Sequence, residues 1–314
     1  MRVSVGLLLL AAPALLAAQS IPDAWFELRE MDMHLHAGLE RELDMKSWID
    51  LSVRDGRKVF VLLDHLELYR KSAAELDLWR KGRKFDGMYP MGPEGHRALM
   101  ADFDKVVAQR QDAILFKAWE IYEGELDTGI EPAPMGMVDL IGWHISPNNG
   151  REAPNGRKTI ERAKQILELQ KKIRVPMILF HPFTMRIENL QRTAQAAGRD
   201  PKSLTVAEYR FFQPGEQEQL ARLLRGSSVY VEISHSTGRY FEDPVCREAL
   251  IADTKPLADM GVQFTVSTDA HGARSFDRAF EPKRYCDALG VTAQNTNTLV
   301  RDLLVMRAKR GIKR

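Results

Sequence analysis

The sequence predicts an α/β protein built as one parallel barrel, and three observations support this fold class. Seven apolar runs recur along the chain, and they are continuous rather than alternating, as strands buried on both faces are. Segments with helical periodicity separate the runs, which favours βαβ units and a parallel sheet. The composition does not change between the runs, so we expect one closed barrel rather than two domains.

The seven expected strands are separated by connections of unequal length. In chain order they cover residues 27–36, 58–65, 113–121, 138–146, 175–183, 228–235 and 262–269. Residues 159–173 place apolar side chains on one stripe, as do Leu299, Leu303 and Met306 near the C-terminus, so both segments are predicted to be helices. The connections over residues 66–112 and 184–226 are longer than a simple crossover needs.

Length and charge exclude several classes of protein. The chain has 314 residues, of which 44% are hydrophobic, enough for one large α/β barrel. Its net charge is only +2, so bulk charge gives no argument for a nucleic-acid partner or an anionic membrane surface. We expect a small-molecule partner instead.

The N-terminus differs from the rest of the chain. Arg2 precedes an apolar stretch from Val5 to Ala18, and Ala18-Gln19-Ser20 offers a small-residue cleavage site. This pattern predicts a secretory signal over residues 1–20, a single domain over residues 21–314, and a secreted or periplasmic protein. The alternative is an uncleaved anchor, although the stretch is short for a transmembrane span. No stable span is expected after cleavage.

The sequence leaves open whether its two cysteines form a disulfide. Cys246 and Cys286 could pair in an oxidising compartment, and buried free thiols are the alternative.

Each expected strand ends in histidine or carboxylate side chains. In chain order these are Asp32, His34 and His36; Asp64 and His65; Glu120; His144; His181; His235; and Asp269 and His271. Barrel enzymes build their active sites at the C-terminal ends of parallel strands. The pattern therefore predicts a metal-dependent hydrolase.

The spacing of the histidines suits a shared ion. Residues i and i+2 of a strand point to the same face, so His34 and His36 can reach one metal ion. His144 and His181 are each the first polar residue after an apolar run, and Pro182 would stop the strand there. Glu120 has two carboxylate oxygens and can bridge two ions.

Other polar residues are expected to support these ligands. Neighbouring strand residues face opposite ways, so we expect His65 to be a ligand and Asp64 to accept a hydrogen bond behind it. Asp32 is predicted to serve His34 or His36 in the same way. His235 follows Glu232 by three residues, and the sequence leaves open whether it touches the site.

Three arginines follow ligand-bearing strands within five residues. Arg186, Arg239 and Arg274 are candidates to hold a phosphate oxygen of an anionic substrate. For each of them, a solvated surface arginine is the alternative.

The order of these residues resembles that of a known family. His34-Leu-His36, Asp64-His65, Glu120, His144, His181-Pro182 and Ser267-Thr-Asp269-Ala-His271 match the motifs of the PHP (polymerase and histidinol phosphatase) superfamily over about residues 30–275. The resemblance implies a distorted TIM-like (β/α)7 barrel that holds two or three divalent ions, often Zn, Mn or Fe. It also implies phosphoester hydrolysis.

The resemblance further implies how the ligands are shared. One ion would take His34, His36, Glu120 and Asp269; a second would take Glu120, His144 and His181; a third would take His65, His271 and one more residue. The segment after His36 departs from the family pattern, and Glu40 and Glu42 are the candidates for the missing third-ion ligand.

The expected mechanism is metal-assisted hydrolysis. Two ions bridged by Glu120 would lower the pKa of a shared water toward ~7, so that a metal-bound hydroxide attacks phosphorus. Asp269 and His235 are the candidates to protonate the leaving oxygen.

Two other functions remain as alternatives. An amidohydrolase-type barrel would cleave amide or lactone bonds, but it commonly uses a bridging lysine, and Lys117 should face away from Glu120. A non-catalytic metal-containing binding protein would not need so complete a set of ligands.

Overall fold

Seven parallel strands form the centre of the molecule. The computed structural model describes residues 25–37, 43–66, 93–128, 138–146, 152–276 and 280–310. The strands lie side by side in chain order and are β1 (Met31–His36), β2 (Val59–His65), β3 (Ile114–Tyr122), β4 (Leu140–His144), β5 (Met177–Phe180), β6 (Val229–Ser234) and β7 (Phe264–Ser267). This arrangement confirms the predicted distorted (β/α)7 barrel.

The end of β7 returns to β1 and nearly closes the barrel. The backbone N–H of Asp269 donates to the carbonyl of His34 (3.0 Å), and the N–H of His36 donates to the carbonyl of Ala270 (3.2 Å). Leu35 and Ala270 form a parallel bridge between these two bonds. The closing seam therefore runs through residues predicted to bind metal.

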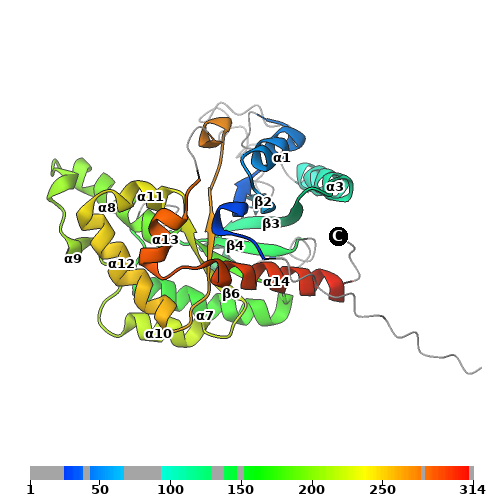
Figure 1. The fold of residues 1–314 in the computed structure, drawn as a ribbon. Helices are drawn as coiled ribbons and strands as arrows, with labels where there is room; N and C mark the ends of the chain where they lie inside the picture. The colour runs from blue at the N-terminus through cyan, green and yellow to red at the C-terminus, as the bar shows by residue number, and fades with distance from the viewer. Residues whose placement is uncertain are drawn as a thin grey trace, which may run out of the picture.

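Helices surround the strands (Figure 1). The longer ones are α1 (Met45–Arg54), α3 (Pro93–Gln109), α7 (Gly156–Ile173), α8 (Pro182–Ala196), α10 (Glu216–Leu224), α12 (Pro244–Asp259), α13 (Lys283–Leu289) and α14 (Ala293–Lys309). Short turns of helix are η1 (Leu28–Glu30), α4 (Glu125–Thr128), η3 (Pro201–Ser203), α9 (Val206–Tyr209), α11 (Ser236–Phe241) and η4 (Ala273–Phe276). The predicted helices over 159–173 and around 299–306 are present as parts of α7 and α14.

The strand boundaries differ from the predicted ones mainly at two places. Residues 28–30, expected to begin the first strand, form the 3₁₀ turn η1. The fifth strand was expected to reach residue 183, but β5 ends at Phe180 and Pro182 opens helix α8. Proline lacks an N–H and has a fixed φ, which suits the first helical position.

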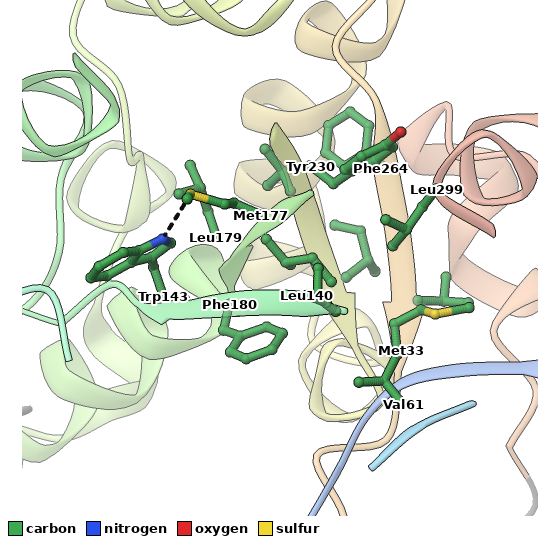
Figure 2. Packing of buried hydrophobic residues seen from close by; sticks show 14 of the residues in the cluster. Met33, Val61, Leu140, Trp143, Met177, Leu179, Phe180, Tyr230, Phe264 and Leu299 are labelled. Carbon is green, nitrogen blue, oxygen red and sulfur yellow. Dashed lines mark hydrogen bonds between the residues drawn. The ribbon is translucent and has the colours of Figure 1, made fainter. Parts of the chain in front are cut away.

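The strands are buried on both faces, and Figure 2 shows their tight packing. The indole Nε1 of Trp143 lies 3.4 Å from the sulfur of Met177. A Cβ at Gly142 would lie 1.7 Å from an atom of the Phe180 ring, so only glycine fits there. The close approach lets Phe180 lie flat against His34, with the ring centroids 3.8 Å apart.

Cys246 and Cys286 are free thiols, each buried, in α12 and α13. The sequence left open whether they form a disulfide or remain as buried thiols, and in the structure they are buried thiols. Within the described ranges, no helix has the length and apolar character needed to cross a membrane.

A buried ion pair joins the C-terminal helix to the start of β4. Arg307 of α14 donates to Asp139 through Nε (3.1 Å) and Nη2 (2.5 Å), and both side chains are almost fully buried. The same carboxylate accepts the backbone N–H of Lys117 (3.1 Å), and the guanidinium lies 4.4 Å from the ring centroid of Phe116. The pair fixes α14 against β3 at the end of the barrel opposite the strand-end histidines.

We expect Arg307→Met to lower the free energy of unfolding by about 3–5 kcal/mol, because it leaves Asp139 buried without its cation. Arg301→Met, on the exposed face of the same helix, should change it by less than about 0.5 kcal/mol. Urea unfolding followed by circular dichroism measures both. Equal stabilities of the two variants would contradict the structural role of the pair.

Candidate metal centre

The two histidines of β1 point to the same place inside the barrel. The pairing of β1 with β2 slips by one residue between Asp32 and Leu35, a bulge of the kind that redirects side chains. The Nε2 atoms of His34 and His36 lie 3.0 Å apart, and both residues are fully buried. Two ring nitrogens at this separation are well placed to hold one ion between them.

Glu120 of β3 connects these histidines to others. Its Oε2 lies 3.4 Å from Nε2 of His34, 3.2 Å from Nε2 of His36 and 3.4 Å from Nε2 of His65. Its Oε1 lies 3.9 Å from Nε2 of His181. The two oxygens of one buried carboxylate therefore face two different sets of imidazoles.

Asp269 makes a second connection of the same kind. Its Oδ1 lies 3.4 Å from Nε2 of both His34 and His36 and 3.1 Å from Nε2 of His271. Its Oδ2 lies 3.8 Å from Nε2 of His181. Asp269 is only partly buried, so it lies where the centre opens toward solvent.

Backbone strain marks two of these positions. Only three non-glycine residues in the described ranges have positive φ, and two of them are His181 (φ 31°) and Asp269 (φ 55°). This left-handed region costs most residues free energy, and His181 also precedes a proline, which disfavours it further. Such strain typically occurs at functional sites.

In the described part of the chain, all the predicted ligands except His271 come together in overlapping groups, and Glu232 joins one of these groups. The ligand atoms within each group lie within 4.8 Å of one another, and the groups are His34, His36 and Asp269; His34, His181 and Glu232; His36, His65 and Glu120; and Glu120, His144 and His181. These buried clusters are suited to a multinuclear metal site.

Charges inside the site oppose the effect of burial. Burial alone would lower the pKa of His34, but the carboxylates of Glu232, Asp269 and Glu120 raise it well above 6.5. Burial would raise the pKa of Glu120, but the charges of His65 and His34 hold it well below 4.5. Burial likewise works against ionised Asp269, and His34 and His271 hold its pKa well below 3.8. Glu120 and Asp269 are therefore ionised.

Two of the imidazoles are held neutral. Burial and the neighbouring His181 lower the pKa of His144 to about 3. Burial and the neighbouring His271 lower the pKa of His36. Neutral imidazole is the form that binds metal ions.

The donor set fits divalent transition metals. Imidazole nitrogens and carboxylate oxygens are the ligands that Zn²⁺, Mn²⁺ and Fe²⁺ accept in proteins. The nearest of these atoms converge from four different strands at 3.0–3.4 Å, with carboxylate oxygens among imidazole nitrogens. A cation at their centre would satisfy both the lone pairs and the negative charge.

Glu232 of β6 is a residue of the site that the sequence analysis did not single out. Its Oε1 accepts a hydrogen bond from Nδ1 of His34 (2.9 Å), and the hydroxyl of Ser267 donates to the same oxygen. Its Oε2 accepts the backbone N–H of His181 (2.7 Å). Glu232 thus directs Nε2 of His34 toward the centre, as carboxylates behind metal-binding histidines commonly do.

Asp32 and Asp64, which were predicted to accept hydrogen bonds behind the ligands, both accept backbone N–H groups beside ligand histidines. Oδ1 of Asp32 accepts the N–H of His34 (3.3 Å) and of Thr268 (2.9 Å), and Oδ1 of Asp64 accepts the N–H of His65 (2.8 Å). The ring nitrogen of His34 has Glu232 as its acceptor, so the predicted role of Asp32 toward that ring is wrong.

His235 precedes α11 as its N-cap residue and belongs to none of the four groups found among the described residues. Its ring lies 5.8 Å from that of Phe280, centroid to centroid.

The three candidate arginines have different surroundings. Arg186 donates to the backbone carbonyls of Pro154, Glu208 and Tyr209, so its guanidinium holds loops together, and its predicted phosphate contact gains no support. Arg239 donates to Glu188 (3.0 Å) and Tyr240. Arg274, in η4 shortly after His271, is exposed. Glu40 and Glu42, the candidate third-ion ligands, lie outside the described residues, as does the predicted signal.

The chain resembles the PHP superfamily in its fold and in the order of its strand-end ligands. No protein-family model matches the sequence, and no curated protein matches it. Among solved structures, histidinol phosphate phosphatase from Lactococcus lactis, complexed with zinc, L-histidinol and phosphate, aligns at a TM-score of 0.47. The two chains share 12% identity, over 88% of this chain and 94% of the other.

A dihydroorotase from Campylobacter jejuni aligns at a TM-score of 0.34, with 15% identity over 93% of this chain and 87% of the other. Matches at this level describe the course of the chain and do not identify a reaction.

We expect Glu232→Gln to weaken metal affinity by about 10- to 100-fold, because the neutral amide is a poorer acceptor for His34 Nδ1–H. Competition with a chelator measures the affinity. Glu248→Gln, an exposed residue of α12, is the control and should bind metal as the parent protein does. An unchanged affinity in Glu232→Gln would show that this carboxylate does not orient His34.

Proposed function

We propose that this protein is a metal-dependent phosphoester hydrolase with a di- or trinuclear centre. The observation that carries the proposal is the sharing of Glu120, whose Oε2 faces His34, His36 and His65 while Oε1 faces His181. A carboxylate shared in this way is what two-metal hydrolysis requires.

The proposed ligands divide between the two faces of Glu120. His34, His36 and Asp269 would hold one divalent ion together with Glu120, and His144 and His181 would hold a second. His65 and His271 are the proposed ligands of a third, with Glu40 or Glu42. Bound Zn, Mn or Fe would supply Lewis acidity that activates water and balances charge on phosphate oxygens.

The chain itself supplies orientation and charge. Glu232 orients His34, and Phe180 packs flat on the same imidazole, so the ring has little freedom to turn. Asp269 lies at the solvent-facing side of the centre, where a substrate would arrive. Proton transfer to the leaving oxygen remains assigned to Asp269 or His235. For Asp269, the low pKa means that it must first take up a proton from the reaction.

Arg274 is the arginine that best fits an anionic substrate. It is exposed, it follows the ligand His271 by three residues, and no acidic side chain among the described residues pairs with it. A guanidinium can donate two hydrogen bonds to a phosphate group. We therefore propose a small anionic substrate, and export of the protein by the N-terminal signal would require that substrate outside the cytoplasm.

The structure offers no support for the alternative of an amidohydrolase-type barrel. Its bridging lysine would have to come from a strand near Glu120, and the Nζ of Lys117 lies 2.5 Å from Asp104 of α3. This side chain points out of the barrel.

We expect Glu120→Gln to lower kcat/KM on p-nitrophenyl phosphate or bis(p-nitrophenyl) phosphate by about 10³-fold or more, since one side of the amide cannot bind a cation. Circular dichroism checks that the fold is intact. Glu125→Gln, five residues further along, is the control and should keep full activity. Full metal content with full turnover in Glu120→Gln would contradict the bridging role.

We expect Arg274→Gln to raise KM for the same phosphoesters by about 10- to 100-fold, the value of a lost charge-assisted hydrogen bond, with a smaller effect on kcat. Arg239→Gln is the matched control, because Arg239 is occupied by Glu188 and Tyr240. Steady-state kinetics distinguish the two. An unchanged KM in Arg274→Gln would remove this residue from the substrate site.

A further inference from the structure

Arg57, just before β2, is one of the largest fully buried side chains in the described part of the protein. Its side chain is only 1% exposed. Arginine is rarely buried unless it is paired. Its Nη1 donates to the carboxylate of Asp55, two residues earlier in the chain. The partners that are distant in sequence indicate what else the buried charge does.

The first partner is Asp32, whose carboxylate joins the two sides of the closing seam. Nε of Arg57 lies 3.1 Å from Oδ2 of Asp32. The carboxylate also accepts the backbone N–H of Thr268 (2.9 Å), the Thr268 hydroxyl (2.6 Å) and the backbone N–H of His34 (3.3 Å). It thus holds the chain at one ligand of β1 and immediately before Asp269.

The second set of partners is a pair of aromatic rings. The guanidinium carbon of Arg57 lies 5.2 Å from the ring centroid of Phe276 and 5.0 Å from that of Phe280. Phe276 also packs on Trp48 of α1, at 5.7 Å between centroids. The two phenylalanines follow His271, and Arg274 lies between His271 and Phe276 in the sequence. Cation–π contacts therefore tie this segment to the barrel.

We propose that Arg57 is a positioning residue of the metal centre. Through Asp32 it fixes the backbone at His34 and Thr268, and through Phe276 and Phe280 it holds the segment that carries His271 and Arg274. It touches none of the ligand atoms itself. This role assumes the metal centre of the proposed function, whereas the contacts of Arg57 are present in either case.

The strained backbone of Asp269 explains why this part of the chain needs support from Asp32 and Arg57. Asp269 has a left-handed backbone, which persists only where the surroundings fix it from several sides. The bonds of Asp32 to Thr268 and of His34 to the Asp269 N–H supply that restraint. A planar guanidinium can meet a carboxylate and lie against aromatic rings at once, whereas a lysine ammonium keeps only the charge.

Three variants test the proposal: Arg57→Met, Arg57→Lys and, as a matched control, Arg307→Met. Arg307 is also a buried arginine with a carboxylate and an aromatic ring, but its partners lie at the opposite end of the barrel. Co²⁺ is the probe, because its visible spectrum reports the coordination geometry. Hydrogen–deuterium exchange of the peptide covering residues 264–272 gives a readout that needs no metal.

Arg57→Met is expected to bind Co²⁺ about 10- to 100-fold more weakly, with a changed visible spectrum and faster exchange over residues 264–272. Arg57→Lys should show the same changes to a smaller degree. Arg307→Met should lose stability but keep the Co²⁺ affinity and the spectrum, and its exchange should rise throughout the barrel rather than selectively over residues 264–272.

Parental affinity, spectrum and exchange in both Arg57 variants would overturn the proposal. If Arg57→Met does not fold, Arg57→Lys alone decides between these outcomes. Absence of Co²⁺ binding in the parent protein would instead count against the proposed function, and the exchange comparison would still decide the role of Arg57.

Discussion

The candidate site depends on two ionised carboxylates, those of Glu120 and Asp269, which lie among histidine side chains at one end of the barrel. Glu120 is almost completely buried, and its charge would be costly there without cations or donors around it. The histidines meet part of this need, since the carboxylates raise the pKa of His34 and the histidines lower that of Glu120. The remaining negative charge makes divalent cations the natural occupants of the site.

The closing seam of the barrel sets the geometry of this centre. Asp269 gains its position from its backbone bond to His34 and from the contact of Asp32 with Thr268. On the other side of β1, its pairing with β2 contains the bulge near His34 and His36. The contacts that close the barrel therefore also position the ligands. The strained backbone positions His181 and Asp269 lie just after the ends of β5 and β7.

The parts predictable from the sequence were those with a local signal. Continuous apolar runs locate buried parallel strands, and polar residues after a run locate the strand end at His65 and His144, whereas β3 continues two residues past Glu120. The parts not predicted depend on distant contacts. Glu232 and His34, which form a hydrogen bond, are 198 positions apart in the sequence. Glu232 is the single charged residue of the apolar strand Val229–Ser234, but the nearby His235 was the more obvious candidate ligand. The backbone partners of Arg186 were also not predictable, because the carbonyls of Pro154, Glu208 and Tyr209 lie more than 20 positions away in the sequence.

The central claim is that the buried centre holds several ions that are needed for ester hydrolysis. The most direct measurement is metal quantitation of the purified protein by mass spectrometry, with phosphoester turnover followed before chelation, after chelation and after metal is restored. The account predicts two or three divalent ions per chain, loss of turnover on chelation and recovery with Zn, Mn or Fe. One ion or none per chain, with turnover that survives chelation, would contradict it.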